Sequence, residues 1–392
     1  MLSSSTRNTR ITLVIAGLNG GGAERVCVNL ANAWAAQGRP VTIQTVFRKS
    51  RTPAYAIDPR VELRDVGWPR GVNLAELNMP AIAPVLRGLQ RARCTELLEE
   101  ITLIAMMRHA ILASSPDLVI SIIDMTNVRV LAAMHETGVP VIACEQTDTS
   151  QVSLGRWQKA RRALYRGAAA VVAPHSTIAE WLADGGARAY AIPNPLVGPP
   201  TIPIARTNQR RRLVTLMRLS HEKRPDLLIP AFGLIAADFP DWDLEIYGVG
   251  SMYESLAELA EELAPGQIHF RGFVTDHYGV LRGADIFVSS SWVEGFGNAI
   301  WEALACGVPV VAMECGDPVR SLVRDGVDGV IVRGGISELA SALESLMRDD
   351  GRRRALAARA SEVLTRFPIE SALQAWDDLL DDVASSSLST SN

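Results

Sequence analysis

Short apolar runs alternate with longer helical segments along the whole chain, and this alternation restricts the fold more than any other feature of the sequence. A buried parallel strand is apolar on both faces, and a helix usually returns the chain to the start of the next strand. Strand-like runs occur at residues 11–17, 41–47, 117–123, 140–145 and 169–174, and again at 212–219, 243–248, 268–274, 285–291 and 309–314. The pattern predicts an α/β protein with two doubly wound, Rossmann-like domains.

A proline-rich stretch without helical periodicity separates the two halves. Because proline stiffens an extended chain and interrupts helices, the stretch predicts a linker at 196–210 between an N-terminal domain at 1–195 and a C-terminal domain at 211–368. A length of 392 residues also exceeds what a single core usually supports. We expect a helix at 369–385 to pack back toward the N-terminal domain and a polar tail at 386–392 to fray.

Charge and cysteine content disfavour several classes of protein. The net charge of −4 and the lack of a reading motif argue against a nucleic-acid-binding protein. No run approaches the roughly 20 apolar residues of a membrane span. The five cysteines are odd in number and none are arranged as CxxC, which favours reduced thiols in a cytoplasmic protein over disulfides or a zinc site.

The two halves of the chain differ in charge. Residues 1–200 contain 21 Lys and Arg against 15 Asp and Glu, and the remainder contains 18 against 28. A basic half beside an acidic half suggests that each meets a different partner, although chance drift of surface charge would also explain the difference.

Three glycines, at positions 20–22, follow the first strand-like run, and a helix is expected to begin near Ala23 or Glu24. The exposed N–H groups of a helix start favour an anion, although a structural turn alone would also explain the glycines. A nicotinamide-binding site is disfavoured, because Arg25 occupies the position of the last glycine of GxGxxG and no acid ends the second strand. No GK[ST] follows a glycine loop, so a Walker A loop is absent.

Two cations follow the first strand-like run of the second half. Arg218 lies at the end of that run, and Lys223 lies five residues further on. The planar guanidinium of an arginine and the point charge of a lysine can converge on a diphosphate. Two solvated basic residues near a loop are the simpler alternative.

Two carboxylates, Glu294 and Glu302, flank a pair of glycines in the apolar stretch EGFGNAIWE. An acid in an apolar setting needs a partner, because its desolvation is unfavourable. A helical rise of about 1.5 Å per residue puts the two carboxylates on the order of 10 Å apart. That separation suits hydroxyls at opposite ends of an elongated ligand such as a nucleotide-sugar, and it is too large for a shared proton. Alternatively, Glu302 is an exposed helix residue and Glu294 is a charge at the helix N-terminus.

These elements resemble the signature of glycosyltransferase family four, the retaining transferases of GT-B fold, whose two Rossmann-like domains face a central cleft. The resemblance rests on Arg218 and Lys223 with the stretch EGFGNAIWEALACGVPVV. It extends over nearly the whole chain through the segments GGAER, IPNP, YGVGSMYESLAELAEEL, FRGFV and FPIESALQAWDDLL. The segments SIIDMTNVRVLAAMHETGVPVIACEQTD and VAMECGDPVRSLVRDGVDGVIV are similar to bacterial exopolysaccharide and lipid-linked oligosaccharide assembly enzymes.

The resemblance implies a nucleotide-sugar donor site. Arg218 and Lys223 would bind the donor diphosphate and stabilise it as it leaves. Glu294 would bind hydroxyls of the donor sugar, and Glu302 would bind those of the ribose. The remaining donor contacts would be the backbone N–H groups of Phe296 and Gly297 at the sugar, Phe273 and Val274 around the base, and Gly21 and Gly22 at the phosphates.

The sequence departs from the family in two places. Met217 stands where a glycine usually precedes the arginine, which would narrow backbone access to the diphosphate. Many relatives carry a histidine in the first domain near the reacting carbon, and here Glu145 takes its place as the candidate catalytic residue. Candidate contacts with the acceptor are Asp124, Asn127 and Asp148, with helix capping as the alternative for the first two.

A basic amphipathic helix is expected at 156–166. Its basic stripe consists of Arg156, Lys159, Arg162 and Arg166, and its apolar side consists of Trp157, Ala160, Leu164 and Ala168. Such a helix is attracted to an anionic membrane surface, although a surface helix with its apolar stripe on the core would look the same. We expect weak contact with the inner face of the cytoplasmic membrane, where a polyprenyl-diphosphate-linked acceptor would be found.

The resemblance thus implies a retaining glycosyltransferase that needs no metal and no cofactor. It would move a hexose or N-acetylhexosamine from a UDP- or GDP-sugar to a lipid-linked or growing saccharide. A nucleotide-sugar epimerase of the same architecture is an alternative, but it would act without an acceptor. A non-catalytic nucleotide-sugar-binding partner is disfavoured by the intact charged residues, and a nicotinamide oxidoreductase by the missing acid after the second strand.

Overall fold

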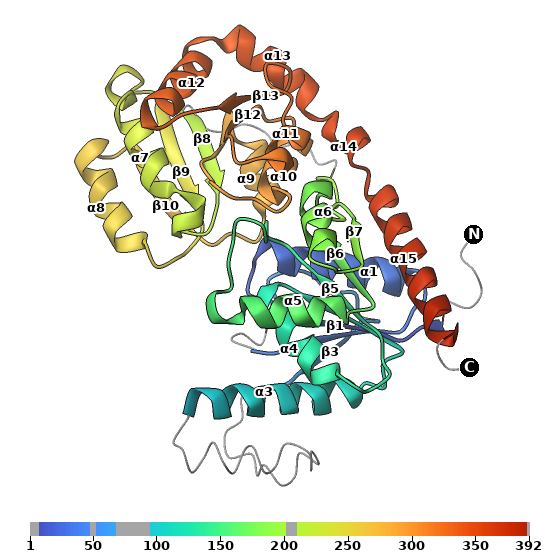
Figure 1. Cartoon of the computed structure of the whole chain (residues 1–392). Coiled ribbons are helices and arrows are strands. Elements are labelled where there is room, and N and C mark those ends of the chain that lie inside the picture. The colour runs from blue at the N-terminus through green and yellow to red at the C-terminus, as the bar shows by residue number, and fades with distance from the viewer. Residues whose placement is uncertain (1–7, 48–51, 68–94, 201–209, 390–392) are drawn as a thin grey trace. The chain divides into compact units, whose positions relative to one another are not determined.

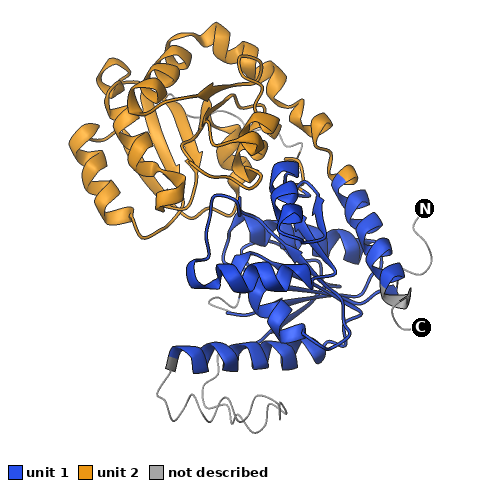
Figure 2. Ribbon diagram, in the orientation of Figure 1, with its two compact units in different colours: residues 1–195, 372–392 blue, residues 196–371 orange. Residues whose placement is uncertain are grey.

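The computed structural model describes residues 8–47, 52–67, 95–200 and 210–389. The chain divides into two units, Met1–Pro195 with Ala372–Asn392 and Leu196–Ser371 (Figures 1 and 2). Residues 201–209 of the predicted linker lie outside the described residues. The rest of the linker belongs to the second unit, where Arg282 donates a 2.8 Å hydrogen bond to the carbonyl of Pro200.

The first unit is built on a seven-stranded parallel sheet with the order β3-β2-β1-β4-β5-β6-β7. Its strands are β1 (Ile11–Ile15), β2 (Val41–Thr45), β3 (Glu62–Asp65), β4 (Leu118–Ile122), β5 (Val141–Cys144), β6 (Ala170–Ala173) and β7 (Ala189–Ala191). Its helices are α1 (Gly22–Ala36), α3 (Thr95–Leu112), α4 (Asp124–Met134), α5 (Gln158–Arg166), α6 (Ser176–Asp184) and most of α15 (Ile369–Ser389). The residues of β1, β2, β4, β5 and β6 are all buried, as expected for strands covered on both faces.

The second unit contains a six-stranded parallel sheet with the order β10-β9-β8-β11-β12-β13. Its strands are β8 (Arg211–Leu216), β9 (Trp242–Tyr247), β10 (Ile268–Gly272), β11 (Ile286–Ser289), β12 (Val310–Met313) and β13 (Gly329–Val332). Its helices are α7 (Pro225–Gly233), α8 (Tyr253–Leu263), α9 (His277–Arg282), α10 (Asn298–Ala305), α11 (Asp317–Leu322), α12 (Ile336–Arg348), α13 (Asp350–Ala360) and α14 (Val363–Arg366).

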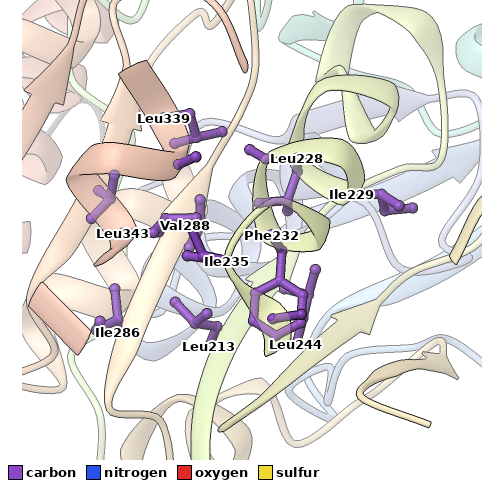
Figure 3. Close-up of a cluster of buried hydrophobic side chains, with 14 of the residues drawn as sticks. Leu213, Leu228, Ile229, Phe232, Ile235, Leu244, Ile286, Val288, Leu339 and Leu343 are labelled. Atoms are coloured by element: carbon purple, nitrogen blue, oxygen red, sulfur yellow. The ribbon is translucent and has the colours of Figure 1, made fainter. Parts of the chain in front are cut away.

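A core of the second unit lies between its sheet and the helices α7 and α12 (Figure 3). The cluster includes Leu213, Leu244, Ile286 and Val288 of the strands, Leu228, Ile229 and Phe232 of α7, and Leu339 and Leu343 of α12. Because α7 follows the first strand of the unit and α12 the last, burial of these side chains joins the beginning of the unit to its end. The core thereby fixes the sheet whose carboxyl edge carries the candidate site.

All ten predicted strand-like runs contain strands, and the α/β architecture is confirmed. The sequence does not predict β3, β7 and β13, and each of these lies at an edge of its sheet. An edge strand is less covered than a central one, so it does not need a long apolar run. The strands ELRD and AYA are correspondingly polar or short, whereas GVIV is apolar and as long as the predicted strands β5 and β6.

Helix α15 continues to Ser389, so residues 386–389 are helical, and the fraying of this tail stays a prediction. The hydroxyls of Ser385 and Ser386 donate to backbone carbonyls four residues earlier, at 2.8 Å and 2.9 Å. These bonds satisfy the serine hydroxyls within the helix. Residues 390–392 lie outside the described residues.

Helix α15 packs within the first unit through an aromatic and a charged contact. The rings of Trp376 and Trp34 meet edge to face, with centroids 5.9 Å apart. Nη2 of Arg39 lies 3.0 Å from Oδ1 of Asp377, and the Trp34 indole donates to the same oxygen at 3.3 Å. Both charged side chains are buried, so removal of one partner alone would strongly destabilise the fold, because the other charge would stay buried without compensation.

We expect Asp377→Ala to lower the free energy of unfolding by about 3 kcal/mol, because it leaves the Arg39 guanidinium buried without its carboxylate. Urea denaturation followed by circular dichroism measures the change. Asp378→Ala is the matched control: its carboxylate is exposed on the same helix and accepts a hydrogen bond from Gln374. Equal losses in the two variants would contradict a stabilising role for the buried pair.

Candidate functional site

The strand order of the second unit reverses between β8 and β11, which are hydrogen-bonded neighbours. In doubly wound sheets, ligands bind outside the carboxyl ends of the strands at such a reversal. The loop after β8 carries Arg218 and Lys223, and the loop after β11 carries Glu294. The fold therefore brings the predicted cations and the first predicted acid to one edge of one sheet.

Lys223 and Glu294 form an ion pair across this reversal, with Nζ 2.7 Å from Oε1. Their side chains are 25% and 15% exposed, so the pair is partly shielded from water. Two further hydrogen bonds join the same loops. The Ser290 hydroxyl donates to the Lys223 carbonyl at 2.8 Å, and the Trp292 N–H donates to the Glu222 carbonyl at 3.1 Å. These bonds hold the two charged side chains in place.

Arg218 extends from this region into solvent. Its side chain is 69% exposed, and Nη1 lies 3.8 Å from Oε1 of Glu222. The pKa of Glu222 lies below its usual range: burial opposes the charged form, but hydrogen bonds from its own N–H and from Ser220, together with the charge of Arg218, outweigh burial. At 3.8 Å the guanidinium is loosely held, and its donors remain available to an anionic ligand.

Two glycines in the loop after β9 fix the backbone around Arg218. A Cβ on Gly248 would lie 1.7 Å from the carbonyl oxygen of Met217, and a Cβ on Gly250 would lie 2.2 Å from that of Leu219. Neither position has room for a side chain. Met217 replaces the glycine that the family usually has. The backbones of the loops after β8 and β9 still approach closely here, because Gly248 and Gly250 of the second loop have no side chain.

Glu302 lies in α10 and is 1% exposed, so the alternative of an exposed helix residue is wrong. Nε2 of His277, the first residue of α9, lies 3.9 Å from its Oε1. Gly297 precedes α10 with a φ of 94°, a left-handed conformation that favours glycine. Phe296 is buried and meets Phe367 edge to face, with centroids 5.7 Å apart, so its ring belongs to the core.

The residues predicted to lie around a base follow β10. Phe273 is exposed and Val274 is half-buried. Val249, in the loop after the neighbouring strand β9, is also exposed. Apolar side chains from two adjacent strand ends thus stand at the same edge of the sheet as Lys223 and Glu294.

In the first unit, the predicted anion site at the start of α1 is occupied by a carboxylate of the chain itself. Oε2 of Glu24 accepts hydrogen bonds from the N–H groups of Gly20 and Gly21, the latter at 3.0 Å. Gly21 is the N-cap and Gly22 is the first residue of the helix. A phosphate that bound to the N–H of Gly21 would have to displace Glu24.

Glu145 follows β5 and is fully buried. The Tyr165 hydroxyl donates to its Oε1, and Nη1 of Arg161 lies 4.0 Å from the same oxygen. Burial, together with the charge of Asp124, raises the pKa of Glu145 to about 8, so the carboxyl is mostly protonated at neutral pH. Asn127 is also buried and donates to the Tyr165 hydroxyl at 3.2 Å. Glu145 and Asn127 therefore belong to one internal hydrogen-bonded cluster, and their predicted roles remain predictions.

Asp148 is buried and closes the loop after β5. It accepts hydrogen bonds from the N–H and hydroxyl of Ser150, at 3.0 and 2.6 Å, and from the Gln151 amide at 2.7 Å. Asp124, the first residue of α4, is half-buried. Of the predicted acceptor contacts, Asp124 is thus the most accessible to a ligand.

The basic stripe of α5 and the turn before it faces outward. Its members, Arg156, Lys159, Arg162 and Arg166, are all exposed. Leu164 and Ala168, on the predicted apolar side, pack against the core of the first unit. The alternative of an apolar stripe on the core is therefore correct, and it leaves the basic stripe on the outer face.

Three observations hold for the described residues. No helix among them has both the length and the apolar character needed to cross a membrane. They contain no group of three or more His, Cys, Asp or Glu side chains placed to hold a metal ion. The described cysteines, at 27, 144, 306 and 315, are free thiols, and Cys94 lies outside the described residues.

The sequence analysis misses four residues that shape the site: Glu222, His277, Ser290 and Trp292. They lie in the loops that follow strands or at the start of a helix, as the predicted residues do. Their position just after a strand is the signal that could have identified them. Their contacts, however, join loops that are far apart in the sequence and cannot be read from it.

Comparisons with known families match both halves of the chain. The family described as "Glycosyltransferase Family 4" matches residues 20–196, and the family described as "Glycosyl transferases group 1" matches residues 203–363. The likeness therefore extends over most of the chain and includes the two loops that carry Arg218, Lys223 and Glu294.

Two curated relatives show how far the similarity reaches. The chain is 24% identical over 382 residues to the GalNAc-alpha-(1->4)-GalNAc-alpha-(1->3)-diNAcBac-PP-undecaprenol alpha-1,4-N-acetyl-D-galactosaminyltransferase of Campylobacter jejuni, covering 95% of this chain and 99% of that protein. It is 28% identical over 171 residues to the poly(glycerol-phosphate) alpha-glucosyltransferase of Bacillus subtilis, covering 43% of this chain and 25% of that protein. The chain spans half or less of the length of seven curated relatives that it matches, the Bacillus subtilis protein among them.

A solved structure matches over nearly the full length. The crystal structure of a TarM variant of S. aureus in complex with Fondaparinux, alpha-GlcNAc-glycerol and UDP has a TM-score of 0.76 and 14% identity, covering 95% of this chain and 99% of that chain. At this identity the likeness shows the fold alone, which is GT-B, as predicted. The two family matches, the curated relatives and the fold together show that the chain belongs to glycosyltransferase family four.

Proposed function

We propose that the chain is a retaining, metal-independent glycosyltransferase that moves a hexose or an N-acetylhexosamine from a UDP- or GDP-sugar to a lipid-linked or growing saccharide. The observation that carries the proposal is the Lys223–Glu294 pair at the reversal of strand order in the second unit. A cation and an acid 2.7 Å apart suit a ligand in which a diphosphate adjoins a hydroxyl-rich sugar. The Campylobacter relative is named for an undecaprenol-linked saccharide and the TarM structure contains UDP, which supports these two substrate classes.

In this proposal, Lys223 and Arg218 stabilise the donor diphosphate as its bond to the sugar breaks. An ammonium group has three N–H donors, so Lys223 can bind a phosphate oxygen while it keeps its hydrogen bond to Glu294. The exposed guanidinium of Arg218 offers a planar fork to the same group. Fixed cations meet the negative charge that develops on the departing diphosphate, and they can lower the barrier without a divalent ion.

Two carboxylates would bind the hydroxyls of the donor sugar and of the ribose. Glu294 would accept hydrogen bonds from donor-sugar hydroxyls, and the backbone N–H groups of Phe296 and Gly297 would donate to the same sugar. Glu302 would accept hydrogen bonds from the ribose hydroxyls, as the family resemblance implies. A donor that lacks one of these hydroxyls would leave a shielded carboxylate with one hydrogen bond fewer. These contacts would therefore make the enzyme selective for its donor sugar.

The acceptor hydroxyl must lose a proton as it attacks the sugar. We assign that proton to an oxygen of the departing phosphate, because attack from the face of the leaving group retains the anomeric configuration. Glu145 is the weaker candidate for this base, since its carboxyl is buried and mostly protonated at neutral pH. It would have to become exposed and lose its own proton first.

A lipid-linked acceptor would be presented at a membrane surface. The exposed cations of the basic stripe at 156–166 would attract anionic lipids from a short distance. We therefore place the protein in weak contact with the inner face of the cytoplasmic membrane.

Thermal unfolding in the presence of UDP-glucose, UDP-N-acetylglucosamine, UDP-N-acetylgalactosamine, GDP-mannose and NAD tests the donor class. At least one UDP- or GDP-sugar should raise the Tm, because a ligand at 100 times its Kd stabilises the native state by about 2.7 kcal/mol. NAD should leave the Tm unchanged.

Incubation of the stabilising donor with lipid-linked saccharides then tests the reaction. Transfer should proceed at the same rate with and without EDTA. A rate that EDTA abolishes and Mg²⁺ restores would contradict metal independence. An isomerised sugar formed without an acceptor would point to the epimerase.

Lys223→Ala and Glu294→Ala should each lower kcat about 100- to 1,000-fold, because each removes a fixed charge that the transition state needs. Both proteins should keep their circular dichroism spectrum. Arg348→Ala and Glu344→Ala are the controls, since these residues form a salt bridge of 2.8 Å on α12 that lies outside the candidate site. Activity near the wild-type value in either site variant would refute the assignment.

The double variant Lys159→Gln/Arg162→Gln should bind phosphatidylglycerol-containing vesicles about 30-fold more weakly than the wild type, since each cation near the surface contributes about 1 kcal/mol. Cosedimentation measures the binding. The double variant Arg352→Gln/Arg354→Gln, on exposed positions of α13, changes the net charge equally and should bind as the wild type does. Equal weakening in both variants would mean that net charge, and not this stripe, determines binding.

A further inference from the structure

Three exposed apolar side chains stand at the carboxyl edge of the sheet in the second unit. They are Val249 after β9, Phe273 after β10 and Trp292 after β11. Val249 and Phe273 lie at the end of the sheet where the base is expected. The backbone N–H of Trp292 helps to hold the loops of the donor site, but its indole has no role assigned there, although 59% of the residue's surface is exposed.

The backbone of Trp292 is fixed while its indole is not covered. Its N–H donates to the Glu222 carbonyl at 3.1 Å, and its neighbours Ser291 and Val293 are both buried. The residue lies two positions before Glu294, whose side chain is 15% exposed. We call the partly shielded pair of Lys223 and Glu294 the floor of the candidate site, and the exposed Trp292, two residues before Glu294, its rim.

The order of the strands places Trp292 at the sugar end of the donor site. Across the edge of the sheet the order is β10, β9, β8 and β11. The loops of these strands carry Phe273, Val249, Lys223 and Trp292 in that sequence. A nucleotide-sugar with its base at Phe273 and its diphosphate at Lys223 thus points its sugar toward Trp292.

The chemistry of an exposed indole beside charged groups favours a saccharide. One face of a pyranose ring presents C–H groups and is apolar, whereas its rim carries hydroxyls. An indole can cover the apolar face, and neighbouring charged side chains can bind the rim. The two loops joined by the Trp292 N–H also carry the charged residues Arg218, Glu222, Lys223 and Glu294, and such a composition suits a saccharide better than the apolar patch of a second protein.

We propose that Trp292 is the stacking platform for the acceptor saccharide, next to the sugar of the donor. The inference rests on the proposed function and deepens it. The donor sugar occupies the shielded floor, where Glu294 reads its hydroxyls, and an acceptor that approaches from solvent meets the rim first. Trp292 then orients the acceptor ring with its attacking hydroxyl toward the donor.

The first arm of the test separates the acceptor from the donor. Thermal unfolding of the wild type and of Trp292→Ala is compared with UDP, UDP-glucose and UDP-N-acetylglucosamine. We expect the same Tm shifts in both proteins. The contrary result is that in Trp292→Ala the UDP-sugars raise the Tm only as much as UDP alone does. That result would assign Trp292 to the donor sugar and overturn the proposal.

The second arm measures saccharide binding without turnover, by saturation-transfer NMR at saturating UDP. The probes are the methyl α-glycosides of glucose, galactose, mannose, N-acetylglucosamine and N-acetylgalactosamine. We expect at least one glycoside to bind the wild type, its Kd to rise at least tenfold in Trp292→Ala, and Trp292→Phe to restore most of the affinity.

Leu234→Ala is the matched control, because Leu234 is a comparably exposed apolar residue after the C-terminal end of α7. It should leave the Kd unchanged. An unchanged Kd in Trp292→Ala, an equal rise in Leu234→Ala, or no glycoside binding to the wild type would each overturn the proposal. If no nucleotide-sugar raises the Tm of the wild type, the proposed donor class is refuted. The glycoside-binding arm still tests the role of Trp292 in that case.

Discussion

The ion pair between Lys223 and Glu294 is the contact on which the candidate donor site depends. It spans the place where the order of the strands reverses, and beyond the ends of β8 and β11 the sheet itself no longer holds the two loops together. The pair is 2.7 Å long and is reinforced by the hydrogen bonds of Ser290 and Trp292. Because these charges are already partly desolvated and oriented, a ligand with a phosphate and hydroxyls would meet groups that need little rearrangement.

The two units differ in how far their predicted ligand groups are engaged by the chain. In the first unit, Gly21 donates to Glu24, Asn127 donates to Tyr165, and Asp148 accepts hydrogen bonds from Ser150. A ligand of these groups must replace an internal partner, and only the difference in free energy would contribute to binding. In the second unit, Lys223 and Glu294 engage each other, but Arg218 is mostly exposed and would lose little on binding an anion. Donor affinity is therefore expected to come mainly from the second unit.

The central strands, and the strand ends at which the candidate site lies, could be predicted from the sequence, because both depend on local patterns. A buried parallel strand needs an apolar run, and a ligand-binding residue in this architecture follows such a run directly. The partners of the acids could not be predicted. Glu294 pairs with a lysine 71 residues earlier, and Glu302 is buried next to His277. These contacts arise from the sheet order, which reverses between β8 and β11 and which no local pattern specifies.

The floor and the rim of the site would select their ligands in different ways. A shielded carboxylate such as Glu294 discriminates strongly, because a sugar that lacks the expected hydroxyl leaves it with a partner missing. An exposed indole such as Trp292 discriminates weakly, because the apolar faces of many pyranoses cover it about equally. A site whose floor is selective for the donor sugar and whose rim accepts many pyranoses would use one donor and several acceptors. That division suits a transferase whose acceptor changes as a saccharide grows, since the donor must be chosen once and the acceptor end varies.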